Sequence, residues 1–154
     1  MFNLILYEPE IPPNTGNIMR LCANTGMKLH LIKPLGFDLH EKKLRRAGLD
    51  YRDFVDVEVY ENLIDCIHKK DLKRIFALTT KGTKKYSDIV YRAGDSFLLG
   101  PETRGLPNKV LELFDPKLHL RLPMANQSRS LNLSNVAAVI VYEAWRQNDF
   151  FQGI

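Results

Sequence analysis

Short apolar runs alternate along the chain with segments that have the spacing of helices. Several runs are nearly continuous, as in strands that are covered on both faces. The pattern predicts strands at Asn3–Tyr7, Lys28–Ile32, Asp56–Tyr60, Arg74–Thr79, Ser96–Leu99 and Leu118–Leu122. It predicts helices at Asn14–Asn24, Glu41–Ala47, Glu61–Lys69, Asn108–Leu113 and Leu131–Gln147. This alternation is typical of an α/β fold with a mostly parallel sheet and helices on both faces.

The last predicted helix contains a segment, residues 136–142, that is apolar at every position. A helix on the surface of a monomer would carry polar residues along one side. The pattern therefore predicts that a second copy of the chain covers this helix in a two-fold homodimer, with Ile140 and Tyr142 at the contact. The alternative is a helix that is buried entirely inside one chain.

Composition indicates an ordinary globular protein, since 45% of the 154 residues are hydrophobic and 26% are charged. This length predicts a single domain over residues 1–154. The start of the chain has no basic segment and only a short apolar run, and no stretch is long enough to span a membrane. The two cysteines, Cys22 and Cys66, are isolated and suit a reducing compartment. We therefore expect a cytoplasmic protein that makes no membrane contact.

Common enzyme motifs are missing from the sequence. There is no glycine-rich dinucleotide loop, no phosphate-binding loop with its lysine, and no serine elbow of a hydrolase. The four histidines are scattered without the spacing of metal ligands, so no metal site is expected. The net charge of +4 permits nucleic acid as a partner without requiring it.

Three polar loops follow predicted strands, at residues 9–17, 100–105 and 123–130. The first loop runs into the helix that carries Arg20. In parallel α/β sheets ligands bind beyond the carboxyl ends of the strands, so the three loops together predict a binding site. Each loop taken alone is also compatible with an ordinary turn.

The loops resemble the three motifs of SPOUT methyltransferases, carried here by the segments NTGNIMR, GPETRG and SRSLNLSN. The similarity runs from Leu6 to Gln147 and is closest to the TrmL (YibK) family of tRNA ribose methyltransferases. It implies a deep C-terminal trefoil knot, S-adenosylmethionine as cofactor, tRNA as partner, and a homodimer whose active site uses both chains. The implied reaction is 2′-O-methylation of the wobble nucleotide, position 34, which is cytidine or a modified uridine. The alternatives are a non-catalytic RNA-binding protein of this fold, a 2′-O-methyltransferase for another RNA site, and a small-molecule methyltransferase.

The resemblance implies that Arg20, Asn14 and Glu102 are catalytic. A guanidinium keeps its charge and offers no acceptor, so we expect Arg20 to stabilise a developing alkoxide rather than to act as a base. Arg20 could instead be a structural partner of a nearby glutamate. Asn14 has the alternative role of a helix N-cap. Glu102 has the alternative of an ion pair with Arg104.

The resemblance also implies that Leu78, Gly100, Leu122 and Ser130 bind the cofactor. The two leucines end strands and would pack against adenine, although core packing explains them equally well. Gly100 would let the backbone approach the cofactor closely. Ser130 could form one hydrogen bond or begin the last helix.

Other polar and basic residues suggest further contacts. Asn132 and Asn135 are polar where a core residue would be expected at the start of the last helix, which favours a role in the site. Basic residues form two clusters, one at Lys42, Lys43, Arg45 and Arg46 and one at Lys81, Lys84 and Lys85. Such runs are usually solvated surfaces. The first cluster lies beside Phe37 and Tyr51 and is predicted to bind RNA.

Overall fold

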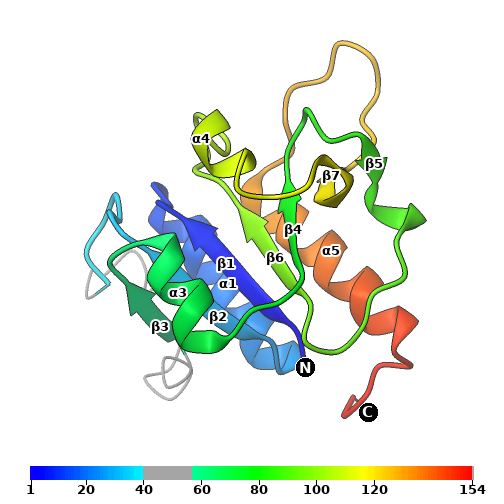
Figure 1. The fold of residues 1–154 in the computed structure, drawn as a ribbon, viewed down its shortest axis with the longest axis horizontal. Helices are drawn as coiled ribbons and strands as arrows, with labels where there is room; N and C mark the ends of the chain where they lie inside the picture. Colours follow the sequence, from blue (N-terminus) through cyan, green and yellow to red (C-terminus); the bar gives the residue numbers. More distant parts are fainter. Residues whose placement is uncertain (40–56, 154) are drawn as a thin grey trace.

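The computed structural model describes residues 1–39 and 57–153. A seven-stranded sheet forms its centre, in the order β3-β2-β1-β6-β4-β7-β5, and every strand pair is parallel (Figure 1). The strands are β1 (Asn3–Tyr7), β2 (Lys28–Ile32), β3 (Val57–Tyr60), β4 (Ile75–Leu78), β5 (Lys84–Lys85), β6 (Ser96–Leu99) and β7 (His119–Arg121). The helices are α1 (Pro12–Thr25), α3 (Leu63–Lys70), α4 (Asn108–Leu111) and α5 (Leu133–Gln147), with 3₁₀ turns η2 (Tyr86–Asp88) and η3 (Pro116–Leu118).

The predicted α/β class is confirmed, and β1, β2 and β6 have the predicted bounds. Strands β4 and β7 are shorter than predicted by one residue at each end. Helix α1 begins two residues earlier and ends one residue later than predicted, α3 begins two residues later and ends one residue later, α4 ends two residues earlier, and α5 begins two residues later. The predicted helix Glu41–Ala47 lies outside the described residues. The sequence did not predict β5, because two lysines at the edge of a sheet carry no apolar pattern.

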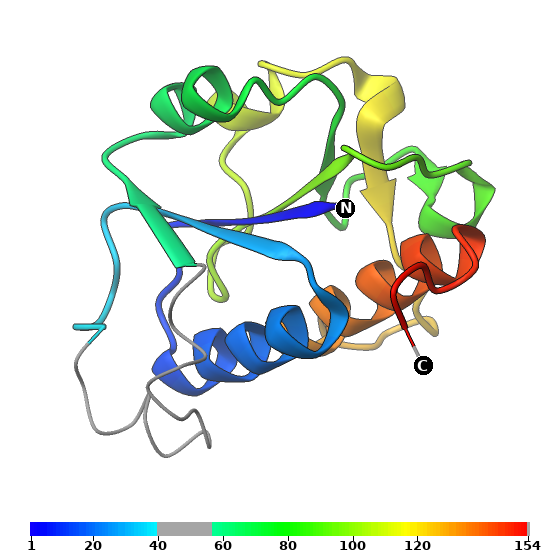
Figure 2. The ribbon, with the colours of Figure 1, turned by 90° about the horizontal axis from the view of Figure 1, so that it is seen from below.

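Helices cover both faces of the sheet, as predicted. Helices α1 and α5 lie side by side on one face, whereas α3 and α4 lie on the other (Figure 2). Each pair closes its own hydrophobic core against the strands. The central strands β4 and β6 are buried at every position, which explains their continuous apolar sequences.

Helix α5 has one buried side and one exposed side. Ile140 and Val141 have no exposed surface and pack in the core that α1 and α5 share, whereas Tyr142 is 48% exposed. The prediction that Ile140 contacts a partner chain is therefore wrong, because its own chain already buries it completely. The alternative of a helix buried entirely inside one chain is wrong as well. A contact through Tyr142 stays a prediction.

The two cysteines are free and buried, as the sequence suggested. Burial raises the pKa of Cys22 to about 12 and that of Cys66 to about 11, so both thiols stay protonated and unreactive. Among the described residues, no helix has the length and apolar character needed to cross a bilayer.

His30 on β2 is fully buried. Its Nε2 lies 3.1 Å from Oδ1 of Asn3, so the neutral ring donates this bond and leaves Nδ1 as the acceptor. Nδ1 has no hydrogen-bond partner among the described residues. Burial lowers the pKa of His30 to about 4, because protonation would place an unpaired charge in the core.

This histidine predicts a pH-dependent stability. The unfolded chain takes up the proton near pH 6.5 and the folded chain only near pH 4, so the free energy of unfolding falls as the pH drops through this window. The His30 contribution to that fall is on the order of 3 kcal/mol. Urea unfolding of His30→Gln between pH 7 and pH 4 should show a correspondingly flatter profile than the wild type. His68→Gln, at an exposed histidine, is the control and should keep the wild-type profile. Identical profiles for the wild type and His30→Gln would contradict the assignment.

Candidate functional site

A cavity of about 310 Å³ lies at the carboxyl ends of β4, β6 and β7. Its walls come from the segment after β4, the loop after β6 and the long connection from β7 to α5. The four residues predicted to bind a cofactor, Leu78, Gly100, Leu122 and Ser130, all line it. The fold therefore brings together residues that are up to 52 positions apart in the sequence.

Gly100 is required by the shape of the loop after β6. A Cβ atom at this position would lie 2.3 Å from the backbone nitrogen of Leu106 and 2.5 Å from the carbonyl carbon of Gly105. Neither backbone atom can move without opening the loop. Gly100 thus allows the loop to fold back on itself, a role that the sequence alone did not indicate.

Glu102 connects this loop to the start of α1. Its carboxylate accepts hydrogen bonds from the backbone N–H groups of Glu10 and Ile11, at 2.8 and 3.1 Å, and from Nδ2 of Asn14 at 3.2 Å. A negative charge at a helix N-terminus is also favoured by the helix dipole. The proposed ion pair of Glu102 with Arg104 is not found, because Arg104 pairs with two other glutamates.

Asn14, in the first loop, is hydrogen-bonded to residues of both the second and the third motif. It lies in the first turn of α1 rather than before it, so the N-cap alternative is wrong. Its side chain is 95% buried; Nδ2 donates to Glu102, while Oδ1 accepts from Nδ2 of Asn132 at 2.9 Å. The N-cap residue of α1 is Ile11, which has no side-chain acceptor, and the helix begins with two prolines that lack N–H groups.

Bonds in the opposite direction complete the link between the first two loops. The Glu10 carboxylate accepts from the backbone N–H and Oγ1 of Thr103, at 3.3 and 2.7 Å, and from Nε of Arg104 at 3.1 Å. Arg104 also donates to Glu8 at 2.9 Å. The bond from Thr103, followed by those from Arg104, lowers the pKa of Glu10. Sequence reasoning missed Glu10 and Thr103, because their pairing spans 93 positions.

The third loop joins through Asn132. This residue is the N-cap of α5 and its Oδ1 accepts from the backbone N–H of Ser134 at 2.9 Å, so the capping role considered for Ser130 belongs to Asn132. The site role expected for Asn132 agrees with its bond to Asn14. Asn135 is exposed on α5 and does not line the cavity.

Arg20 lies on the exposed side of α1, together with Asn17. Neither residue is part of the cavity wall. Within one chain, the predicted catalytic arginine and the predicted cofactor residues are therefore not brought together. The described residues hold no group of three or more histidine, cysteine or acidic side chains placed to bind a metal ion.

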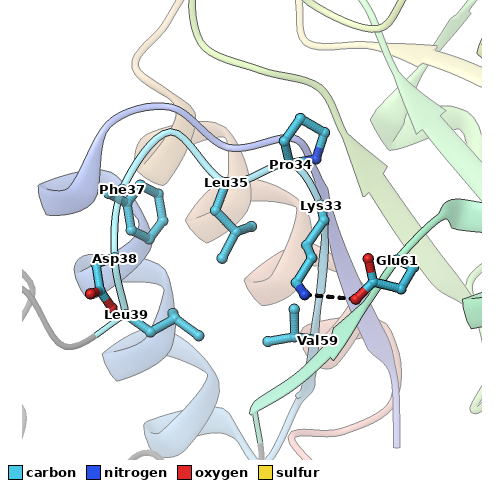
Figure 3. A pocket seen from close by; sticks show the side chains of 8 residues that line it. All are labelled: Lys33, Pro34, Leu35, Phe37, Asp38, Leu39, Val59 and Glu61. Carbon is cyan, nitrogen blue, oxygen red and sulfur yellow. Dashed lines mark hydrogen bonds and ion pairs between the residues drawn. The ribbon is translucent and has the colours of Figure 1, made fainter.

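A second, more open cavity of about 600 Å³ lies at the carboxyl ends of β2 and β3 (Figure 3). Lys33 and Glu61 form an ion pair of 2.6 Å at one side of it. The lining residues are Lys33, Pro34, Leu35, Phe37, Asp38, Leu39, Val59 and Glu61. None of them was predicted to bind the cofactor or to act in catalysis. The basic cluster predicted to bind RNA, at Lys42, Lys43, Arg45 and Arg46, lies outside the described residues.

The parallel α/β sheet, with a cavity lined by the second and third motif loops, agrees with the resemblance to SPOUT methyltransferases. A family model agrees: the chain belongs to the SpoU rRNA Methylase family, whose model matches residues 1–142.

Individual relatives cover almost the whole chain. A protein of Methylovorus glucosotrophus named tRNA (cytidine(34)-2′-O)-methyltransferase is 58% identical over 150 residues, which are 97% of each chain. The crystal structure of a protein described as an RNA methyltransferase from Bacillus anthracis is 45% identical, has a TM-score of 0.90, and covers 99% of this chain and 98% of its own. A structure described as giving insights into 2-OH methylation of C/U34 on tRNA is 43% identical, with a TM-score of 0.86 and 97% of each chain covered.

The bonds of Glu102 predict a loss of stability in Glu102→Gln. An amide offers one acceptor oxygen in place of two and turns an NH₂ group towards backbone N–H donors, so at least one donor loses its partner. The expected cost is about 1–3 kcal/mol in the free energy of unfolding, measured in urea. Glu112→Gln, an exposed change at the end of α4, is the matched control. Equal stability of the two variants would show that Glu102 does not hold the loops together.

Proposed function

We propose that the protein is a tRNA 2′-O-ribose methyltransferase that uses S-adenosylmethionine and acts on nucleotide 34, a cytidine or modified uridine. Family membership supports the enzyme class, and the name of the 58% identical relative supports the substrate. The observation that carries the proposal is the cavity lined by the second and third motif loops, to which hydrogen bonds of Glu102 and Asn132 tie the first loop. The substrate choice is supported further by the 43% identical structure that concerns C/U34 of tRNA.

The residues of the cavity fit the methyl donor. Leu78 and Leu122 provide apolar walls for an adenine ring, and Ser130 offers a hydroxyl for one hydrogen bond. The bound cofactor would supply an activated methyl group, a transfer for which no metal ion is needed.

Arg20 is the proposed electrostatic catalyst. A fixed guanidinium beside the ribose hydroxyl would stabilise the alkoxide that develops as the methyl group is transferred. Because Arg20 is absent from the cavity wall of its own chain, we propose that it serves the cavity of a partner chain in a homodimer. The exposed sides of the adjacent helices α1 and α5, with Arg20 on one and Tyr142 on the other, offer a surface for that contact.

Further properties follow from the same resemblance. We propose a single domain over residues 1–154, with a deep C-terminal trefoil knot. The knot rests on the resemblance to SPOUT methyltransferases, whose family the chain shares. A tRNA substrate also favours a cytoplasmic location.

Labelled S-adenosylmethionine with total tRNA from a strain that lacks the protein tests the proposed reaction. We expect label in tRNA, and mass spectrometry of digested tRNA should locate a 2′-O-methyl group at position 34. Binding of tRNA without transfer would instead favour the non-catalytic alternative. Methylation at another nucleotide would favour a different RNA site, and transfer without RNA a small-molecule substrate.

Arg20→Ala should lower kcat by about 100- to 1000-fold, because one electrostatic donor to a developing oxyanion commonly contributes that much. Cofactor affinity, measured by calorimetry, should change little, because Arg20 is proposed to act on the ribose hydroxyl in the transition state and not to bind the cofactor. Arg20→Lys keeps the charge and should retain part of the activity. Normal turnover of Arg20→Ala would exclude the catalytic role.

The dimer is tested by Tyr142→Asp. A charge on the exposed side of α5 should yield a monomer in sedimentation velocity and reduce methyl transfer. Val90→Asp, at a residue that is 71% exposed on another segment, should leave both properties unchanged. A wild-type protein that sediments as a monomer at micromolar concentration would refute both the dimer and the shared site.

A further inference from the structure

Two groups stand out among the positive side chains in the part of the chain that the structure describes. The first group forms ion pairs with carboxylates: Lys33, Lys70, Lys73, Arg74, Arg104 and Arg146. The second group gathers on β5, β7 and the loops next to them, and none of its members forms an ion pair within residues 1–39 and 57–153. We call this second group the β5–β7 edge; it consists of Lys81, Lys84, Lys85, Lys117, Arg121 and Arg129.

The strand register places two of these charges directly against each other. Lys85 pairs with Arg121 across the parallel strands, so the two side chains share one face of the sheet, and both are exposed. Like charges opposite each other on neighbouring strands repel. A lysine on an edge strand is explained by protection against pairing with another chain. That explanation does not cover the arginine on the inner strand beside it, whereas an anion bound between the two would.

The nearest carboxylates along the chain do not neutralise the edge. Asp115 accepts from the backbone N–H of Lys117 at the start of η3, at 2.8 Å. Asp88, at the end of η2, accepts from the hydroxyl of Ser87. Neither of them forms an ion pair with a residue of the edge within the described chain.

The β5–β7 edge is continuous with the cavity. Lys81 and Leu120 both line the cavity, and β5 begins three residues after Lys81. A Cβ atom on Gly82 would lie 2.5 Å from the carbonyl carbon of Leu120, so the turn between Lys81 and β5 packs tightly against β7. Figure 1 shows β5 and β7 at one side of the sheet, below the connection to α5.

We propose that the β5–β7 edge binds the phosphate backbone of the RNA substrate, beside the nucleotide whose ribose enters the cavity. This inference rests on the proposed function and adds a surface distinct from the cluster at residues 42–46. RNA is favoured over an acidic protein, because the positive charges of the edge begin at the cavity wall with Lys81, where a polynucleotide must pass to deliver one ribose. Phosphates neutralised there would release counterions and make binding depend on salt.

The test is binding of tRNA to Lys84→Gln/Lys85→Gln, followed by fluorescence anisotropy over a range of salt concentrations. Each lost phosphate contact should reduce the slope of log affinity against log salt by about 0.7 to 0.9. The double variant should therefore have a slope about 1.4 to 1.8 shallower than the wild type. Lys28→Gln/Lys69→Gln removes the same charge near the opposite side of the sheet, from exposed residues, and should keep the wild-type slope.

Further measurements separate RNA binding from folding. Lys84→Arg/Lys85→Arg should retain the wild-type slope, and S-adenosylmethionine affinity should be equal in all variants. The melting temperature of Lys84→Gln/Lys85→Gln should be unchanged or higher, because the repulsion between Lys85 and Arg121 is removed. A slope equal to that of the Lys28→Gln/Lys69→Gln control overturns the inference, as does equal competition by polyglutamate.

The two proposals fail in different ways. A wild type that transfers no methyl group to tRNA, but whose salt slope falls in Lys84→Gln/Lys85→Gln, refutes the proposed function and retains the RNA-binding edge. Normal methyl transfer together with an unchanged slope refutes the edge and retains the function.

Discussion

The candidate site depends on reciprocal hydrogen bonds between two loops, in which a glutamate of each loop accepts from backbone N–H groups of the other. Glu102, in the loop after β6, accepts the backbone N–H groups at the start of α1, and Glu10, in the loop before α1, accepts that of Thr103. Helix α1 cannot satisfy its own start, because Ile11 provides no side-chain cap. The loop that forms a cavity wall and the helix that carries Arg20 are therefore positioned together.

In this arrangement, three separate regions are proposed to bind the cofactor, to form the dimer with the catalytic arginine, and to bind the RNA. The cavity at the carboxyl ends of β4, β6 and β7 is suited to the methyl donor. The exposed sides of α1 and α5 carry Arg20 and the proposed dimer contact. The β5–β7 edge carries positive charge that no carboxylate pairs with in the described chain, so it is suited to the substrate backbone. The hydrogen bond between Asn14 and Asn132 joins the first loop to the third motif, so a displacement of that cavity wall would also displace the start of α1.

The sequence predicted those parts of the fold that local pattern determines. Continuous apolar runs predicted the buried strands, and the four residues that the resemblance implied for cofactor binding, Leu78, Gly100, Leu122 and Ser130, line one cavity. The sequence pattern did not predict contacts between residues far apart in the chain. Ile140 was assigned to a partner because an apolar run does not tell which side α1 and the sheet will cover. The partners of Glu102 were missed because they lie about 90 positions away.

A crystal structure of the protein with S-adenosylhomocysteine tests the central claim most directly, because this product of methyl transfer occupies the methyl-donor site without reacting. The proposed site predicts density for one molecule per chain in the cavity lined by Leu78, Gly100 and Leu122, with the bonds of Glu102 to the start of α1 intact. Density in the more open cavity beside Phe37, or none at millimolar ligand, would contradict it.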